Sequence, residues 1–381
     1  MNYKRLGNYI ELIDVRNTDL SVDKLLGLTI DKKFIPSVAN TIGTNMKRYK
    51  IIRRNQFACS TMQVRRDGKM PIAILKDYDE AIISQAYPVF KVIDEQILNP
   101  DYLMMWFTRQ EFDRQATFHA VGGVRGSIEW VDFLDFELPI PSIEKQREIV
   151  AEYQAVENKI KTNEAICEKL EETALTIYRR WFVNNGEKTE ARLEDYVEVN
   201  PKVKLKKGDR ASYVGMADVS ENSMTIQGYI KRKFKGGGAR FLNNDTLLAR
   251  ITPCLENGKT AFVNFLKEDE VAWGSTEFIV LRARGNSNPY WTYCLARNED
   301  FRNYAISSMV GSSGRQRVQS DYLNEYKLPN YNPKVIERFE VKAKPIFKSI
   351  KHINQENQKL HQLQALLLGS MTREEEKRIK I

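Results

Sequence analysis

Two stretches of the chain carry the same heptad pattern. From Ile149 to Trp181, apolar and small residues recur in alternating steps of four and three, the a/d spacing of a helix that packs lengthwise against another helix. A second stretch, Phe339 to Met371, repeats these steps at an offset of 339 − 149 = 190. A long amphipathic core helix is the alternative interpretation of each stretch. The pair predicts an intramolecular coiled coil whose seam residues are Ile149, Tyr153, Val156, Ile160, Leu170, Ile177, Ile346, Ile350, Ile353, Leu360 and Leu367.

The sequence between and before these stretches is also duplicated. Short motifs of the first half recur in the same order in the second half, while the residues between them differ. The chain is therefore predicted to be a tandem repeat of a unit of about 190 residues, each with one globular module and one long helix. The matches are Leu6-x-x-Tyr9-Ile10-Glu11 with Leu193-x-x-Tyr196-Val197-Glu198 at an offset of 187, and Asp67-Gly68-Lys69 with Asn257-Gly258-Lys259 and Leu138-Pro139 with Leu328-Pro329 at 190.

Each module is predicted to combine short strands with helices. In the first module, residues 49–60 and 71–75 contain β-type runs, and Asp67-Gly68 favours a hairpin turn between them. Asn99-Pro100 is predicted to start a helix, since proline suits the first helical position, and Asn288-Pro289 starts the matching helix.

The ends of the two long helices carry capping signals. Ser142 is the expected N-cap of the first helix, and Asn332 with Pro333 is expected to open the second. Pro345 lies inside the second heptad stretch and predicts a kink or a later start there.

Several function classes are disfavoured. The chain has no run of 18 apolar residues to span a membrane, and its first residues lead into no apolar signal segment. Its four cysteines form no CxxC pair, which argues against a metal site and for reduced thiols in the cytoplasm.

Catalytic motifs are incomplete. Asn99-Pro100-Asp101-Tyr102 resembles the Asn-Pro-Pro-Tyr of amino-methyltransferases but lacks the second proline and any accompanying cofactor loop. Gly258-Lys259-Thr260 resembles the end of a P-loop, yet Pro253 stands where that loop needs glycine. We therefore expect no catalytic, cofactor-binding or metal-binding residue in this chain.

The charge pattern favours a nucleic acid as partner. The net charge is +9 and the pI is about 9.1. Lys and Arg beside glycine in turn-like segments suit phosphate, and Arg or Gln can also reach base edges. Each of these residues alone is more often a solvated surface charge, but they recur in both modules. The candidate DNA-binding residues are Arg65, Arg66, Lys69, Arg125, Lys231, Arg232, Lys233, Arg240, Arg250, Arg315, Gln316 and Arg317.

One segment, together with the duplicated frame, carries a family resemblance. Leu138-Pro139-x-Pro141-x-x-Glu144-x-Gln146-x-x-Ile149 leads from the first module into the first heptad helix. The whole chain resembles the specificity subunit of type I restriction-modification systems. The second copy departs from this pattern, since Tyr331 replaces the second proline and Ile336 replaces the glutamine.

The resemblance implies an α+β fold with pseudo-two-fold tandem symmetry. Two globular α/β target recognition domains, residues 1–141 and 186–331, would be joined by two long antiparallel helices that form the coiled coil. These helices would lie in residues 142–185 and in residues 332–381, which include a C-terminal tail. Such a protein would bind a bipartite, asymmetric DNA site, with the helices setting the distance between the half-sites.

The resemblance also implies the partners. They would be double-stranded DNA and two methyltransferase subunits that carry S-adenosylmethionine and methylate adenine, and an ATP-dependent restriction endonuclease subunit can join them. The expected partner surface is the exposed face of the long helices near Glu157, Lys161, Glu164, Glu168, Lys351 and Glu356. Two other functions remain open: a stand-alone DNA methyltransferase or nuclease, and a coiled-coil protein scaffold. The resemblance does not give the target sequence.

Overall fold

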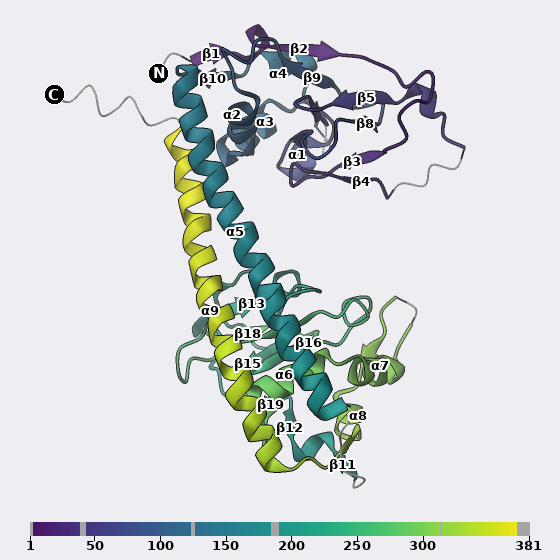
Figure 1. Ribbon diagram of the computed structural model, residues 1–381, viewed down its shortest axis with the longest axis vertical. Coiled ribbons are helices and arrows are strands. Elements are labelled where there is room, and N and C mark those ends of the chain that lie inside the picture. The colour runs from purple at the N-terminus through teal and green to yellow at the C-terminus, as the bar shows by residue number, and fades with distance from the viewer. Residues whose placement is uncertain (1–2, 39–42, 123–125, 184–189, 313, 372–381) are drawn as a thin grey trace, which may run out of the picture. The chain divides into compact units, whose positions relative to one another are not determined.

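The computed structural model describes residues 3–38, 43–122, 126–183, 190–312 and 314–371 (Figure 1). The chain divides into two compact units. Unit 1 comprises residues 1–159 and 360–381, and unit 2 comprises residues 160–359. Both units mix helices and short strands, which confirms the predicted α+β class.

The module of unit 1 contains ten short strands and four α-helices among the described residues. They are β1 Tyr3–Arg5, β2 Ile10–Ile13, β3 Leu26–Leu28, β4 Phe34–Pro36, β5 Lys50–Arg53, β6 Phe57–Cys59, α1 Val64–Asp67, β7 Ile72–Ile74, β8 Glu80–Ile83, β9 Val89–Val92, α2 Pro100–Thr108, α3 Gln110–His119, α4 Trp130–Leu134 and β10 Glu137–Pro139.

The core of unit 1 lies between a four-stranded antiparallel sheet and helix α2. The strand order is β2-β9-β6-β7, and Phe57 stacks on its cross-strand partner Phe90 with 5.1 Å between ring centroids. Phe107 of α2 packs edge-on against both rings. Helix α2 begins at Pro100, as predicted, because the Asn99 side chain accepts hydrogen bonds from the first free backbone N–H groups.

The connection between β6 and β7 differs from the predicted tight turn. Helix α1 occupies it, and Gly68 ends that helix in the left-handed region at φ 63°. The Asp-Gly pair therefore forms a helix C-terminus, where glycine is also favoured, and not a two-residue hairpin turn. A dipeptide signal alone does not distinguish these two uses of a left-handed glycine.

Unit 2 contains the second module. Its elements are β11 Glu190–Arg192, β12 Val197–Val199, β13 Arg210–Val214, β14 Ile230–Lys233, β15 Ala239–Phe241, β16 Thr246–Ala249, β17 Thr260–Phe262, β18 Ala272–Gly274, β19 Phe278–Ala283, α6 Pro289–Arg297, α7 Glu299–Ser307, β20 Met309–Val310, β21 Arg317–Val318, α8 Ser320–Asn324 and β22 Lys327–Pro329.

The sheet of unit 2 repeats the sheet of unit 1. Its order is β12-β19-β16-β17, which matches β2-β9-β6-β7 strand for strand. The register matches as well: Ala58 pairs with Val89 in unit 1, and their counterparts at an offset of 190, Leu248 and Ile279, pair in unit 2. Unit 2 also has a second four-stranded sheet, β14-β13-β18-β15. The duplication seen in the sequence is therefore present in the strand order.

The two long helices are α5, Ile143–Tyr178, and α9, Pro333–Ser370. Ser142 and Asn332 cap them as predicted, and α9 continues through Pro345 from its start at Pro333, so the expected later start is wrong. In unit 2 the helices lie side by side and run antiparallel (Figure 1). Asn163 contacts Asn357, and Cys167 contacts Asn354, one turn farther along α5.

The seam residues are buried to different degrees. Ile149, Ile160 and Ile350 are buried, and the other eight are half-buried: Tyr153, Val156, Leu170, Ile177, Ile346, Ile353, Leu360 and Leu367. Tyr178 and Phe182, next to the seam positions Ile177 and Trp181, are fully buried. The heptad pattern missed these two because the end of α5 and the π-helical turn Arg179–Val183 that follows it also pack against the core of unit 2, including Trp291 of α6.

Each module is connected to the start of its following helix by a buried amide side chain. In unit 1, Gln146 of α5 accepts from the backbone N–H of Asn99 and donates to the carbonyls of Ile97 and Pro141, each at 2.8 Å. In unit 2, where Ile336 replaces this glutamine, Asn288 of the module donates to the Ile336 carbonyl at 3.2 Å. In unit 1 the helix supplies the amide side chain of this connection, and in unit 2 the module supplies it.

Candidate nucleic-acid interface

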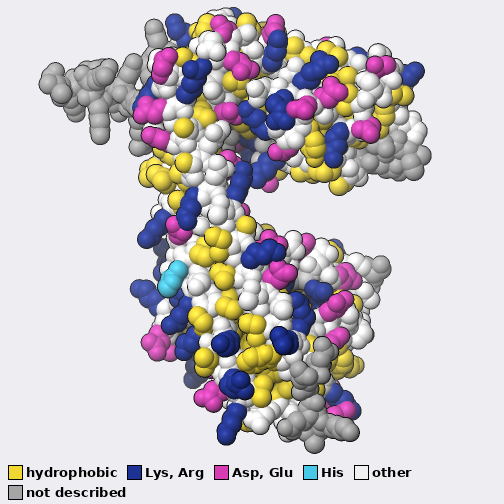
Figure 2. Space-filling model, viewed as in Figure 1, with side chains coloured by type: hydrophobic (Ala, Val, Ile, Leu, Met, Phe, Trp, Pro, Cys, Tyr) yellow, Lys and Arg dark blue, Asp and Glu magenta, His cyan; other side chains and the backbone are white. Residues whose placement is uncertain are grey.

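Charge alone does not outline a binding surface on this protein. On the face that Figure 2 shows, Lys and Arg side chains are interspersed with Asp and Glu side chains. We therefore divide the candidate basic residues into those that form an ion pair with an acidic side chain and those that do not.

In unit 1 the candidates gather at α1. Arg65 and Arg66 are exposed on this helix, and Lys69 follows it. Arg66 forms an ion pair with Asp67 at 2.6 Å, and Lys69 pairs with Asp31 at 3.3 Å. Arg65 has no acidic partner among the described residues, and it lies against the backbone of Gly126. Arg125 lies outside the described residues.

In unit 2, four candidates lie on the second sheet. Lys231, Arg232 and Lys233 are exposed on the edge strand β14, and Arg240 is exposed on β15. None of the four pairs with an acidic side chain in the described part of the chain. An edge strand whose basic side chains form no ion pair with the described acidic residues suits contact with a phosphate backbone.

Two aromatic residues, which the sequence analysis missed, lie between these basic residues. The Arg232 guanidinium lies over the Tyr213 ring at 4.7 Å, and Tyr213 packs edge-on against Trp273 with 4.5 Å between centroids. Trp273 is the cross-strand partner of Arg240. The row Arg232, Tyr213, Trp273 and Arg240 therefore lies on one face of the sheet, a combination that favours nucleic acid.

Steric constraints explain why glycine stands at position 238, in the segment that leads into β15. Gly238 adopts φ 76°, and a Cβ there would lie 2.4 Å from the carbonyl oxygen of Gly274. Only glycine allows this approach, because any side chain would collide with backbone. Gly238 thus places Arg240 beside Trp273.

The remaining candidates form a second group in unit 2. Arg250 is half-buried and donates to the Val318 carbonyl at 2.7 Å. The Gln316 carbonyl accepts hydrogen bonds from both the backbone N–H and the hydroxyl of Thr252. Arg315 is exposed. These contacts fix the backbone of residues 316–318 against the end of β16.

Arg317 is held by a carboxylate. Its Nε and Nη2 donate to Glu277 at 2.9 and 2.8 Å. The pKa of Glu277 is lowered, first by this hydrogen bond and then by the nearby positive charge of Arg317 and Arg250. Glu277 was not recognised in the sequence, because it lies 40 residues from Arg317 and belongs to no motif.

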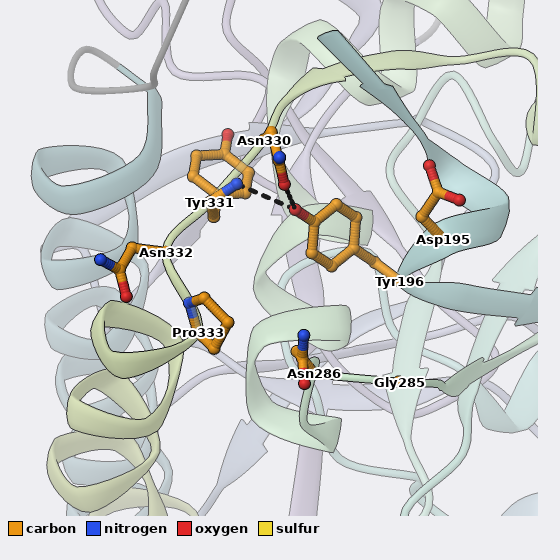
Figure 3. A pocket seen from close by; sticks show the side chains of 8 residues that line it. All are labelled: Asp195, Tyr196, Gly285, Asn286, Asn330, Tyr331, Asn332 and Pro333. Carbon is orange, nitrogen blue, oxygen red and sulfur yellow. Dashed lines mark hydrogen bonds between the residues drawn. The ribbon is translucent and has the colours of Figure 1, made fainter. Parts of the chain in front are cut away.

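A pocket of about 500 Å³ lies at the start of α9 in unit 2 (Figure 3). The Tyr196 hydroxyl beside it donates to Asn330 at 3.0 Å and accepts from the Tyr331 N–H at 2.9 Å. Asp195 accepts from the backbone of Arg192. The polar side chains of Asp195, Tyr196 and Asn330, which line this pocket, bond to one another or to nearby backbone.

The described ranges contain no cluster of side chains that could hold a metal ion. Within them, no helix is long and apolar enough to cross a bilayer. The four cysteines are free thiols, and Cys59, Cys167 and Cys294 are buried.

Residues 31–172 match the family model of the type I restriction modification DNA specificity domain. This match covers most of the unit 1 module and most of α5.

Two curated relatives match a similar length of chain. The chain is 28% identical over 142 residues to the specificity subunit of the type I restriction enzyme EcoEI from Escherichia coli. It is 28% identical over 137 residues to the EcoAI specificity subunit from the same organism. These matches cover 36% and 35% of this chain, and only 24% and 23% of the relatives.

One solved structure resembles nearly the whole chain. It is the type I restriction-modification S subunit from M. genitalium, with a TM-score of 0.53, 13% identity, and 97% and 95% coverage of the two chains. At this identity the likeness shows a shared fold. Residues 31–172 are therefore similar to the type I restriction modification DNA specificity domain, and the predicted resemblance of the chain to type I specificity subunits is confirmed.

Proposed function

We propose that this chain is the DNA-recognition subunit of a type I restriction-modification complex and has no catalytic activity of its own. The observation that carries the proposal is the match of residues 31–172 to the DNA specificity domain. Arg65, Lys231, Lys233 and Arg240, which have no acidic partner in the part of the chain that the structure describes, supply the positive surface that such a role requires.

The proposed DNA site is bipartite and asymmetric. The two modules share a strand order but differ in the side chains that they expose, which suits binding of two unlike half-sites. Residues 1–141 and 186–331 would form the two target recognition domains. The helices in residues 142–185 and 332–381 would pair as an antiparallel coiled coil in a pseudo-two-fold arrangement and set the distance between half-sites.

The proposed partners supply the chemistry. Two methyltransferase subunits with S-adenosylmethionine would methylate the bound site, and an ATP-dependent endonuclease subunit would join them in the cytoplasm. The proposed partner surface is the exposed face of the long helices near Glu164 and Glu168 of α5, together with the half-buried Lys351 of α9.

The test is a map of modified bases. The chain would be co-expressed with the methyltransferase encoded beside it in a host free of DNA methylation, and modified bases located by single-molecule sequencing. We expect a two-part adenine-methylated motif with a fixed gap, and we expect that motif to be lost on deletion of either module.

An assay of the purified chain and the same map address the alternatives. Methyl transfer by the purified chain alone would favour a stand-alone enzyme. The absence of any motif, with an active methyltransferase that binds the chain, would favour a protein scaffold and contradict DNA recognition.

A further inference from the structure

The hydrogen bonds of Arg317 use only part of its guanidinium. This group has five N–H donors, one on Nε and two on each Nη. Glu277 occupies Nε and one N–H of Nη2, and the Arg315 carbonyl, at 3.3 Å, occupies one N–H of Nη1. One N–H on each Nη therefore has no partner among the described residues.

Those two remaining donors suit a particular base. When the Arg315 carbonyl takes the N–H of Nη1 that faces Cδ, the remaining N–H groups of the two Nη atoms are neighbours and match the O6 and N7 acceptors that guanine presents in the major groove. A carboxylate that binds the Nε side of the guanidinium fixes its plane and leaves the donors on the Nη atoms for the base. The Arg317 side chain is 41% exposed and Glu277 is 23% exposed, so a base can reach the arginine while the carboxylate is partly covered.

The backbone that carries Arg317 is also fixed. Arg250 and Thr252 bond to the carbonyls of Val318 and Gln316, on either side of it, and the Val318 N–H donates to the Arg250 carbonyl. The arginine is thus held from its backbone and from its guanidinium, which lowers the entropy lost on binding.

The corresponding positions of unit 1 hold different chemistry. At an offset of 190, Ser127 corresponds to Arg317 and Tyr87 to Glu277. The strands beside Glu277 and Tyr87 have the same register, and Ser127 and Tyr87 form no ion pair like that of Arg317 and Glu277, so this pair belongs to unit 2.

We propose that Arg317 recognises a guanine in the half-site bound by unit 2, and that Glu277 is a positioning residue that orients Arg317. This inference rests on the proposed function, because it names a base contact of the same DNA-recognition role.

The test is selection of binding sites by the full-length chain. The wild type and the variants R317Q, R317K and E277Q would each select from a pool of double-stranded DNA with a randomised central stretch, and the bound DNA would be sequenced. K327Q is the matched control, because Lys327 is an exposed lysine of unit 2 whose partner is Glu190.

We expect each of the three variants to lose the preference for G·C at one and the same position, by about 10- to 100-fold, within one half-site. The other half-site and the gap should stay unchanged, as should every position for K327Q. R317K keeps the positive charge beside Glu277 but cannot form the bidentate hydrogen bond to a base. This variant therefore tests the proposal even if R317Q fails to fold.

Two results would separate the hypotheses. A wild-type motif that all three variants preserve at every position overturns the roles of Arg317 and Glu277 and leaves DNA recognition intact. A preference lost in the arginine variants and kept in E277Q overturns the positioning role alone. Failure of the wild type to select any motif contradicts the proposed function itself.

Discussion

Asn163 of α5 donates a hydrogen bond to Asn357 of α9, with 2.8 Å between Nδ2 and Oδ1. The two side chains are 1% and 8% exposed, and the second N–H of Asn163 goes to Glu356, also at 2.8 Å. A buried polar pair in an apolar seam favours one alignment of two helices, because any shift leaves both groups unpaired.

Breaking this pair from one side should destabilise unit 2. Asn163→Leu leaves Asn357 buried without its partner, and we expect a loss of about 1–3 kcal/mol in the free energy of unfolding. The double variant Asn163→Leu/Asn357→Leu should lose less than the sum of the single variants. Urea unfolding measures the free energy of unfolding of the single and double variants. Gln355→Leu, at an exposed position of α9, is the control. Strictly additive losses would show that the pair does not act as a unit.

Lengthening both helices should change only the gap of the DNA motif. Seven residues inserted after Lys159 and seven after Lys359, where the division between units crosses α5 and α9, keep the heptad pattern in both helices. The insertion adds about 10 Å of helix, equal to about three base pairs at 3.4 Å each. Base-modification mapping should then show unchanged half-sites separated by a longer gap. An unchanged gap would contradict the distance-setting role of the helices.

The basic edge strand should govern the salt dependence of DNA binding. Replacing Lys231, Arg232 and Lys233 by glutamine removes three unpaired charges from β14. If all three contact phosphate, the slope of log K against log salt should fall in magnitude by up to about 2.7. The matched control replaces Lys342, Lys344 and Lys348, which are exposed on α9, and makes the same change in net charge. Equal effects of both triple variants on titrations at several salt concentrations would argue against a contact at β14.

Alkaline pH should destabilise unit 2 through its buried tyrosines. Burial raises the pKa of Tyr178 and Tyr293 well above the ordinary value, and burial raises that of Tyr326 to about 12. Because the folded state keeps these phenols neutral, their contribution is complete below pH of about 10 and is lost as pH rises through the folded values.

Tyr178→Phe tests this directly. Each fully buried tyrosine contributes a fall of up to about 1.4 kcal/mol per pH unit above pH of about 10. The variant should match the wild type near pH 8 and lose stability less steeply above pH 10 in urea unfolding. Tyr322→Phe, at an exposed position, should follow the wild type. Parallel curves for Tyr178→Phe and the wild type would contradict the assignment.

The long helices and the starts of the module helices could be predicted from the sequence because their signals are local. Heptad spacing, the caps at Ser142 and Asn332, and the Asn-Pro helix starts each depend on neighbouring residues. The residues that face the unit 2 module were missed at Tyr178, the end of α5, and at Phe182, in the π-helical turn Arg179–Val183 that follows it. A heptad pattern describes one partner helix, and this stretch has a second neighbour.

The candidate site was predicted only as a list of basic residues. Which of them are neutralised depends on carboxylates that are distant in sequence, such as Glu277 for Arg317 and Asp31 for Lys69. The aromatic pair Tyr213 and Trp273 comes together through parallel strand pairing over 60 residues, for which the sequence carried no signal that we recognised.

The amide side chains at the module–helix connections have a consequence for how such proteins diversify by recombination. Gln146 forms its hydrogen bonds with main-chain groups of the first module, so a foreign module could take the place of the first one without bringing a matching side chain. The second module supplies its own amide, Asn288, to the main chain of α9, so any replacement there must carry that asparagine. Exchange of modules between genes should therefore be more permissive in the first position than in the second.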